Sequence, residues 1–380
     1  MKHNRATLPL LGIRVVDLTR VLAGPLCTMM LGDLGAEVIK VERPEEGDET
    51  RGWGPPFDER GESAYFLSVN RNKLSLAADL GSWRDRALVR DLMEEADVVV
   101  DNFRRGTLAR MGLDPDQIRS ERPSLVWLSI TGFGADSDRP GYDYVVQAES
   151  GWMAITGEPD GSPMKVGVAL ADVVAGKDAA AAILAALVGR ARTGEGARLH
   201  ISLAASATAA LVNVAQNALV SGSEARRWGN AHPNLVPYQL FDAADRPLVI
   251  AVGNDLQWKA LTRVLGLDSL GEDPALESNA GRLAHRERVV AALAERLRSR
   301  TASEWVRSLD AAGIPCGTVR SVLEALREVR ASPLSGVASP VGGLVRLDPP
   351  RLDQHGELIR ARGWGAFTTA FGDAGRGESR

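Results

Sequence analysis

The sequence has only two cysteines, Cys27 and Cys316, among its 380 residues. Two thiols are too few for the disulfide framework of a small secreted domain or for a thiolate metal site. The five histidines show no metal-ligand spacing either. We therefore expect no bound metal, and thiols that stay reduced in the cytoplasm.

Long apolar runs are also absent. The longest near-apolar stretch, Ala179–Val188, is about half as long as a membrane-spanning helix requires. Residues 1–10 contain no sustained apolar segment, so we predict no signal peptide. A net charge of −4 and a pI near 5.9 argue against nucleic acid as the main partner. The expectation is a cytoplasmic protein with no membrane or nucleic-acid partner.

What is present is a regular alternation of strand and helix patterns. The chain is too long for one ordinary core, so two domains are expected. We predict a large Rossmann-like domain over residues 1–203, completed by 335–380. A helix and linker over 204–233 and a smaller α/β domain over 234–334 follow. The alternation predicts an α/β fold with a mostly parallel sheet covered by helices on both faces.

The elements can be placed from hydrophobic pattern and from helix and strand signals. The predicted strands are Ile13–Leu18, Glu37–Glu42, Asp97–Val100, Leu125–Ile130, Arg198–Leu203, Tyr238–Phe241 and Pro247–Val252. The predicted helices are Pro25–Leu34, Trp83–Glu95, Thr107–Met111, Tyr144–Ile155, Asp172–Ala191, Ala204–Val220, Gln257–Leu265, Arg282–Arg298 and Ala302–Ala312. Residues 372–380 are predicted to form a loose tail.

The first strand leads into a helix through Gly24, as in dinucleotide-binding domains. Gly24 stands alone, however, and the G-x-G-x-x-G glycines that admit a pyrophosphate are missing. The sequence also has no P-loop and no Gly-x-Ser-x-Gly elbow. The pattern predicts a Rossmann-like architecture without its usual cofactor, and an NAD-dependent dehydrogenase is a distant alternative.

Asp172 is the most informative single residue. A strand-like, glycine-marked approach from Val166 delivers its carboxylate to the start of an alanine-rich helix. There the unpaired amides and the helix dipole favour a negative charge, so the residue can be a simple N-cap or a reactive group.

Arg43 and Arg104 directly follow predicted strand ends, where ligands collect in such sheets. Their guanidinium groups suit a phosphorylated nucleotide tail.

The chain resembles the class III CoA-transferases, a group that includes formyl-CoA transferase, carnitine CoA-transferase and the related α-methylacyl-CoA racemases. The resemblance runs from about Leu8 to about Arg360. Its blocks are Val21-Leu-Ala-Gly-Pro25, Leu34-Gly-Ala-Glu-Val-Ile-Lys-Val-Glu42, Gly47-Asp-Glu-Thr-Arg-Gly-Trp53, Asn70-Arg-Asn-Lys73, Asp101-Asn-Phe103, Arg110-Met-Gly112, Gly141-Tyr-Asp143, Ala171-Asp172 and Gly313-Ile-Pro-Cys-Gly317. So many ordered blocks make the resemblance specific.

The resemblance implies that Asp172 attacks an acyl-CoA thioester, forming a mixed anhydride and then an enzyme–CoA thioester. It implies an interlocked homodimer whose active site lies between the large domain of one subunit and the small domain of the other. CoA would be a substrate, and no permanently bound cofactor is implied. The positions that match the CoA site are Val21, Leu22, Ala23, Arg43, Ala78, Asn102, Phe103, Arg104, Arg110, Arg139 and Tyr142.

Two differences between this chain and members of the family narrow the choice of reaction. Racemases of the group have a histidine where this chain has Tyr142, and a phenol is a poorer proton shuttle than an imidazole. Formyl-CoA transferase has a glutamine where this chain has Leu22, although Trp53 matches. A transferase is therefore favoured, with an acyl-CoA racemase as the alternative. A non-catalytic acyl-CoA-binding relative is the alternative from another class.

The segment 226–239 resembles succinyl-CoA-dependent transferases that act on dicarboxylates. Arg226, Arg227 and His232 are therefore candidates to hold the distal carboxylate of the acyl group, together with Trp53 as a further substrate residue. The alternative is a surface linker whose arginines face water. The expected reaction is CoA transfer from an acyl-CoA, with succinyl-CoA favoured, to a free carboxylic acid.

Overall fold

The computed structural model describes residues 8–374. Residues 1–7 lie outside this range, as does the part of the predicted tail from residue 375, while 372–374 belong to a helix. The described chain forms two compact units. The large unit comprises the described parts of Met1–Met153, Lys165–Ser223 and Val329–Arg380, and the small unit comprises Ala154–Met164 and Glu224–Glu328.

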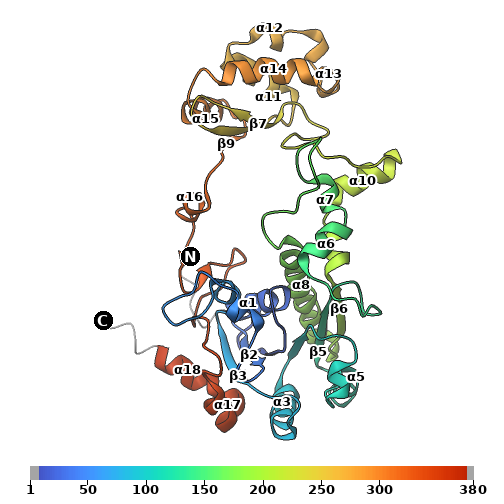
Figure 1. Ribbon diagram of the computed structural model, residues 1–380, viewed down its shortest axis with the longest axis vertical. Helices are drawn as coiled ribbons and strands as arrows, with labels where there is room; N and C mark the ends of the chain where they lie inside the picture. The colour runs from blue at the N-terminus through green and yellow to red at the C-terminus, as the bar shows by residue number, and fades with distance from the viewer. Residues whose placement is uncertain (1–7, 375–380) are drawn as a thin grey trace. The chain divides into compact units, whose positions relative to one another are not determined.

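A six-stranded, wholly parallel sheet forms the centre of the large unit (Figure 1). Its strand order is β3-β2-β1-β4-β5-β6, the order of doubly wound dinucleotide-binding folds. The strands are β1 (Arg14–Asp17), β2 (Glu37–Glu42), β3 (Lys73–Ala77), β4 (Val98–Asp101), β5 (Val126–Thr131) and β6 (Arg198–Ser202). The predicted α/β class with a parallel sheet is confirmed.

Helices cover both faces of this sheet. Successive strand residues point to opposite sides, so each strand contributes side chains to a core on either face. Val15 of β1 packs into a core with the helices that follow β1 and precede β6, whereas Val16 packs into a second core on the other face. The helices of the unit are α1 (Ala23–Asp33), α2 (Ala64–Leu67), α3 (Trp83–Glu95), α4 (Thr107–Arg110), α5 (Pro115–Glu121), α6 (Asp143–Glu149), α7 (Trp152–Ile155, ending in the small unit), α8 (Leu170–Thr193), α9 (Leu203–Ala209), α10 (Val212–Ser221), α17 (Gly356–Arg362) and α18 (Ala366–Ala374). A short hairpin, β10 (Ala331–Ser332) and β11 (Gly336–Val337), completes it.

Strand β3 is not among the predicted strands, because its buried face carries Lys73 and Ser75 and breaks the apolar pattern. The predicted helix Ala204–Val220 is wrong as a single element: it is divided into α9 and α10, which are bent by 71°. The predicted helix Tyr144–Ile155 is likewise divided, because Gly151 between α6 and α7 takes a left-handed φ of 88°.

The small unit has a three-stranded antiparallel sheet in the order β7-β8-β9, backed by a core that includes Trp258 and Trp305. Its strands are β7 (Tyr238–Asp242), β8 (Pro247–Ala251) and β9 (Cys316–Thr318). Its helices are α11 (Asp255–Leu265), α12 (Asp268–Gly271), α13 (Asn279–Ala284), α14 (Arg286–Leu297), α15 (Ala302–Ala311) and α16 (Val322–Leu326). The predicted helix Arg282–Arg298 is two helices that meet at His285.

Within residues 8–374, no single helix has the length and apolar character needed to cross a membrane. Only α9 and α10 taken together meet the length and composition test, and they are the pair bent by 71°.

Candidate active site

Helices α1 and α8 begin close together beside the carboxyl ends of the parallel strands. Glycines make this approach possible: a Cβ on Gly176 of α8 would lie 2.6 Å from the Ala23 carbonyl oxygen at the start of α1. A Cβ on Gly24 would lie 2.3 Å from the Thr19 side chain. The close packing brings the first turn of α8 next to the loop over residues 19–22.

Asp172 lies in the first turn of α8, where Ala169 is the N-cap residue. The interpretation of Asp172 as an N-cap is therefore wrong. The carboxylate of Asp143, on α6, accepts hydrogen bonds from the amides of Ala171 at 2.8 Å and Asp172 at 3.3 Å instead. Asp143 caps the helix from outside and leaves the Asp172 carboxylate free of that role. The sequence block Gly141-Tyr-Asp143 contains this residue, but the amides that it caps lie 28 and 29 residues further along the chain and could not be predicted.

The Asp172 carboxylate is poorly solvated and unpaired. The residue is only 8% exposed. Burial raises the pKa of its carboxyl to about 7, and the neighbouring Asp143 carboxylate adds to the rise. Among the acids buried within residues 8–374, Asp172 alone has a carboxylate with neither an ion pair nor a hydrogen bond. The others are Asp17, Asp33, Glu42, Asp48, Glu62 and Asp101.

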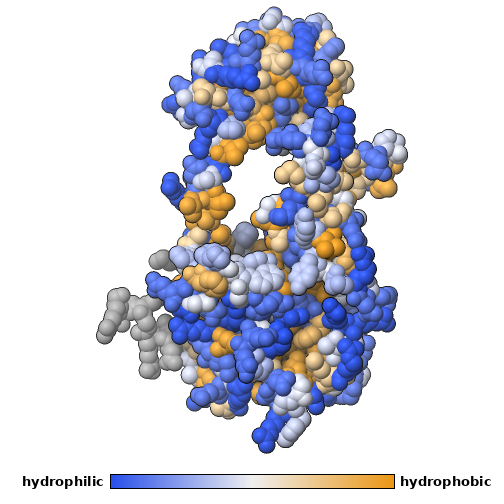
Figure 2. All heavy atoms as spheres, viewed as in Figure 1, coloured by the Kyte–Doolittle hydropathy of each residue, from blue (hydrophilic) through white to orange (hydrophobic). Residues whose placement is uncertain are grey.

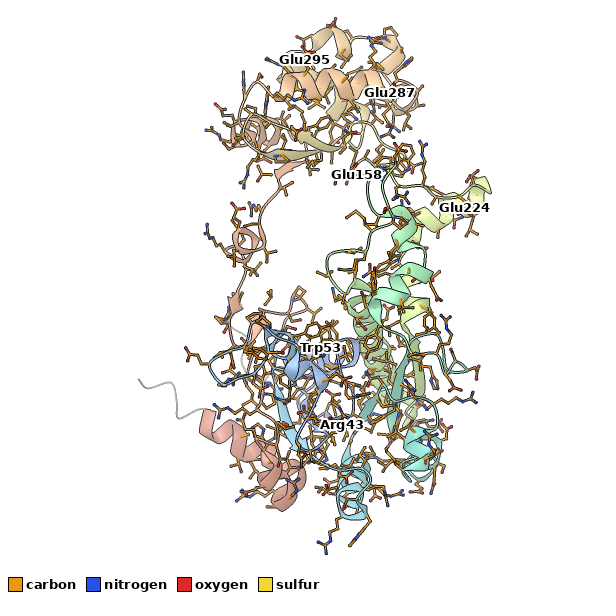
Figure 3. All side chains as sticks on the ribbon, viewed as in Figure 1. Arg43, Trp53, Glu158, Glu224, Glu287 and Glu295 are labelled. Atoms are coloured by element: carbon orange, nitrogen blue, oxygen red, sulfur yellow. The ribbon has the colours of Figure 1, made fainter. Side chains whose placement is uncertain are left out.

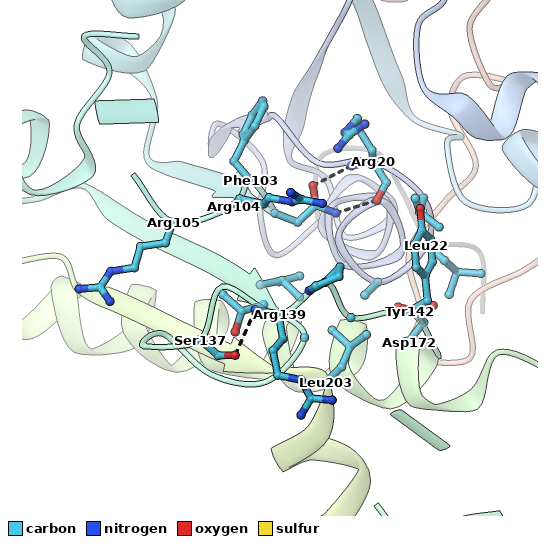
Figure 4. Close-up of a pocket in the computed structure, with 18 of the residues that line it drawn as sticks. Arg20, Leu22, Phe103, Arg104, Arg105, Ser137, Arg139, Tyr142, Asp172 and Leu203 are labelled. Atoms are coloured by element: carbon cyan, nitrogen blue, oxygen red, sulfur yellow. Dashed lines mark hydrogen bonds between the residues drawn. The ribbon is translucent and has the colours of Figure 1, made fainter. Parts of the chain in front are cut away.

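Asp172 lines a cavity of about 200 Å³ in the large unit (Figure 4). Nine of the residues singled out from the sequence lie on its wall: Val21, Leu22, Ala23, Asn102, Phe103, Arg104, Arg139, Tyr142 and Asp172. Arg20, Arg105 and Ser137 also line it and were not predicted. The wall thus combines one buried carboxylate with several guanidinium groups.

A second cavity, of about 280 Å³, is lined by the predicted residues Arg43 and Ala78. Arg20 and Phe103 belong to the walls of both cavities, so the two adjoin. Arg43 directly follows β2 in the large unit (Figure 3). Together the cavities can hold an elongated ligand, with its reactive end at Asp172 and a flat apolar group near Ala78.

The loop between β1 and α1 is held in a strained shape. Val21 has a left-handed φ of 72°, which is unfavourable for a β-branched residue. The side-chain amide of Asn102 accepts a hydrogen bond from the Arg20 N–H at 3.1 Å and donates one to the Arg20 carbonyl at 2.8 Å (Figure 4). The Val21 N–H donates to both oxygens of Asp48 at 3.3 Å. Asn102 therefore lines the cavity mainly as a clamp on this loop.

Buried ion pairs support the loop from below. Lys40 pairs with Asp48 and Lys73 pairs with Asp17, each at 3.0 Å and with fully buried side chains. Burial lowers the pKa of Lys73 to about 8, although Asp17 opposes the change. Asp48 also caps the turn Glu49–Gly52. The sequence blocks around these residues thus hold the wall of the site in place.

Arg110, Arg139 and Trp53, three predicted residues of the large unit, form contacts with neighbouring side chains. Arg110 lines neither cavity; it is exposed and donates to the Thr107 hydroxyl at 3.0 Å. Arg139 pairs with Glu149 at 2.6 Å while lining the first cavity. Trp53 is 42% exposed and packs edge-on against Tyr65.

Burial raises the pKa of the Tyr65 hydroxyl to about 12, and the charge of Asp172 is the next largest cause of this rise. Tyr65 is therefore a residue near Asp172 that the sequence did not reveal.

The three predicted residues of the small unit have different environments. Arg227 donates to the backbone carbonyls of Glu158, Ala154 and Gly161, at 2.7–3.4 Å. Arg226 instead stacks over the Trp228 ring, 4.0 Å from its centroid. His232 accepts the Asn234 N–H on Nδ1 at 3.0 Å.

The sequence model of the family described as CoA-transferase family III matches residues 10–337. The chain belongs to this family. The transferase is 44% identical over 324 residues to the succinate–glutarate CoA-transferase of Agrobacterium fabrum, covering 83% of this chain and 81% of that protein. It is 42% identical over 369 residues to the succinyl-CoA:glutarate CoA-transferase of Mus musculus, covering 91% and 84%.

A solved structure agrees with the fold. A CAIB/BAIF family protein from Brucella suis superposes with a TM-score of 0.83 at 40% identity, over 93% of this chain and 98% of that one. The predicted family and enzyme class are confirmed. The residues assigned to the CoA site remain predictions, which the arrangement of the two cavities supports.

Proposed function

We propose that this family III enzyme transfers CoA from succinyl-CoA, or a similar dicarboxylic acyl-CoA, to a free carboxylic acid through Asp172. The observation that supports this most strongly is the unpaired, buried Asp172 carboxylate on the wall of a cavity rich in guanidinium groups. Relatives named as succinate–glutarate and succinyl-CoA:glutarate CoA-transferases, at 44% and 42% identity, support the substrate class.

The first half-reaction forms two covalent intermediates. An Asp172 carboxylate oxygen attacks the thioester carbonyl carbon, the C–S bond breaks, and CoA leaves as a thiolate. The product is a mixed anhydride between Asp172 and the donor acyl group. The thiolate then attacks the aspartyl carbonyl carbon, the anhydride C–O bond breaks, and the donor leaves as a carboxylate. Asp172 now carries CoA as a thioester.

The second half-reaction is the reverse with a new acid. The acceptor carboxylate attacks the aspartyl thioester, which releases CoA thiolate and forms a second anhydride. The thiolate attacks the acyl carbonyl of that anhydride, and Asp172 is restored as a carboxylate. A pKa near 7 suits this cycle, because the poorly solvated anion reacts readily and is still populated at neutral pH.

The two cavities suggest how CoA binds. We place the adenine near Ala78, the phosphates near Arg43 and Arg104, and the thioester at Asp172. The strained Val21 loop, clamped by Asn102, forms the wall between these ends. This placement does not require Arg110, which lines neither cavity and donates to the Thr107 hydroxyl.

We also propose that the enzyme is an interlocked homodimer. Helices α10 and α16 contain no buried residue in the single chain. Yet they carry large apolar side chains that are 73–78% exposed: Leu219, Val220, Val322 and Leu323. Figure 2 shows apolar side chains on the surface over both helices. Exposed apolar helices of this kind are expected to be covered by a second copy of the chain.

The decisive experiment traps the covalent intermediates. Hydroxylamine added during turnover with succinyl-CoA should convert the wild-type peptide containing Asp172 to a hydroxamate detectable by mass spectrometry. Asp172→Asn keeps the side-chain size but removes the anionic nucleophile. It should bind CoA, remain unmodified and lose exchange by several orders of magnitude. Exchange at the wild-type rate in this variant would refute the mechanism.

A further inference from the structure

One buried glutamine of the large unit joins helix α6 to the segment that leads to Asp172. Gln147 lies on α6 with none of its surface exposed, and α6 packs against α8 (Figure 1). Its side-chain oxygen accepts the Val166 N–H at 2.8 Å. Its side-chain nitrogen donates to the Val168 carbonyl at 3.2 Å and to Oδ2 of Asp143 at 2.7 Å. One side chain therefore binds the backbone at two points ahead of α8 and also binds a carboxylate.

The partners of this amide allow it a single orientation. Only the oxygen of Gln147 can accept from an N–H, and only its nitrogen can donate to a carboxylate. Asp143 is held in the same way, because its Oδ2 accepts from Gln147 while its Oδ1 accepts from the amides of Ala171 at 2.8 Å and Asp172 at 3.3 Å. All three partners are donors, which is the pattern of an ionised carboxylate. Gln147 thus fixes which oxygen of Asp143 faces the start of α8.

The segment from Val166 to Val168 lies largely at the surface. Gly167 and Val168 are exposed, Val168 by 57% of its surface, and Val166 is only partly buried. Packing contributes little to the path of this segment, so hydrogen bonds must hold it, and Gln147 supplies two of them from the interior. Hydrogen bonds of a buried side chain are strengthened by its low-dielectric surroundings. The approach to α8 therefore depends on Gln147.

We propose that Gln147 is a positioning residue for CoA transfer, which holds the Asp143 carboxylate against the first turn of α8, beside Asp172. This inference rests on the proposed function and adds a positioning residue to its site. Asp143 repels the Asp172 anion, and this repulsion ends when Asp172 becomes a neutral anhydride or thioester. The negative charge then leaves with the CoA thiolate or with the released donor carboxylate. Asp143, kept in place by Gln147, therefore favours the covalent intermediates over the free carboxylate.

Gln147→Met removes the three hydrogen bonds and keeps the length of the side chain. Loss of a hydrogen bond to a charged group should lower kcat about 10- to 100-fold. The KM for succinyl-CoA should change by less than about threefold, because Gln147 lines neither cavity. In an Asp143→Asn background the same substitution should have a much smaller effect, since Gln147 acts through the Asp143 charge. Additive losses in the double variant, or a loss confined to KM, would overturn the inference.

A second variant keeps the test sound if Gln147→Met folds poorly. Gln147→Glu has the same shape, and its protonated carboxyl can donate to Oδ2 of Asp143 as the amide does. The variant should retain much of the wild-type kcat at about pH 6 and lose it above about pH 8, where the shared proton leaves. The other titratable groups around this site are Asp172, Tyr65 and the exposed Lys165, and the wild type has them too. A pH profile identical to that of the wild type would contradict the positioning role.

The covalent intermediate provides the most direct measurement. Enzyme is mixed with succinyl-CoA and succinate at a fixed ratio at about pH 8.5, well above the pKa of Asp172, and intact-mass spectrometry gives the proportion that carries CoA. This proportion should fall several-fold in Gln147→Met and in Asp143→Asn. Val146→Ala is the matched control, because Val146 is the buried neighbour on α6 and its side chain cannot form a hydrogen bond. It should lower the melting temperature and leave the proportion unchanged. An unchanged proportion in Gln147→Met would overturn the inference and leave the proposed function standing.

Thermal unfolding separates the two proposals, because it needs no turnover. If the wild type carried no CoA on Asp172, the proposed function would fail, but the placement of Asp143 would still be tested. Asp172→Asn removes the repelled charge, so at about pH 8.5 it should raise the melting temperature more in the wild-type background than in the Gln147→Met background. Equal increases in the two backgrounds would show that Gln147 does not hold Asp143 beside Asp172, and would overturn the positioning role.

Discussion

The raised pKa of Asp172 has a consequence for stability that can be measured without any substrate. In the unfolded chain the carboxyl has its ordinary pKa of 3.8, and in the folded protein the pKa is about 7. The fold therefore favours the neutral form. Its contribution is fully present below about pH 4 and is lost as the pH rises through 7, since the buried group must ionise.

The difference between these two pKa values corresponds to about 4 kcal/mol at about 1.36 kcal/mol per pKa unit. Because the group borders a cavity that water can enter, we expect ~2–4 kcal/mol in practice. Asp172→Asn removes the ionisation but keeps the shape. It should therefore melt several degrees above the wild type at pH 8.5 and at nearly the same temperature at pH 4.5.

The assay is thermal unfolding followed by circular dichroism across this pH range. Asp178→Asn is the matched control, because Asp178 lies on the same helix with its side chain in solvent. An equal or lower melting temperature for Asp172→Asn at pH 8.5 would show that the carboxylate is stabilised by its surroundings. Asp172 would then not be a poorly solvated carboxylate that is held ready to react.

Three further outcomes follow from the geometry. Asp143→Asn keeps the α8 cap but removes the charge that helps to raise the Asp172 pKa, so the acid limb of the kcat/KM profile should move to lower pH; an unchanged profile would contradict this. Arg43→Ala should raise the KM for acyl-CoA about tenfold, whereas Arg110→Ala, outside both cavities, should raise it less; the reverse order would refute the CoA placement. Leu219→Asp together with Leu323→Asp should convert the proposed dimer into monomers in light scattering, and a dimer that persists in this variant would exclude these helices from the interface.

Local sequence patterns predicted the parts of the fold that depend on local interactions. The strands of the sheet core were predicted because apolar β-branched residues such as Val15 and Val16 fill them on both faces. Strand β3 was missed because its lysine is buried, and the compensating Asp17 lies 56 residues earlier. No local pattern shows that a charge in one segment will neutralise a charge in another.

The residues of the candidate site were likewise predictable only where the pattern that identifies them is local in the sequence. Asp172 could be found because its approach and its helix are contiguous in the chain. Asp143, which caps that helix, could not be assigned its role because its partner amides lie 28 residues away. Arg226 and Arg227 looked equivalent in the sequence, yet one stacks on Trp228 and the other binds backbone carbonyls. Arg286, on α14, lies over the same Trp228 ring at 4.8 Å, so only the tertiary structure brings these two arginines together.

Asp172, the proposed nucleophile, differs from the structural carboxylates of the described chain in how its buried charge is compensated. Every other buried acid of the described chain has a partner, as Asp17 has Lys73 and Asp48 has Lys40. Those pairs offset the desolvation of each charge and fix the loop that forms the cavity wall. Asp172 has no such offset, and Asp143 adds repulsion. A structural carboxylate in this place would be more stable with a cation beside it, but a paired carboxylate would be a weaker nucleophile. The instability at Asp172 is thus tolerated because the paired network around it keeps the helix and loop in place.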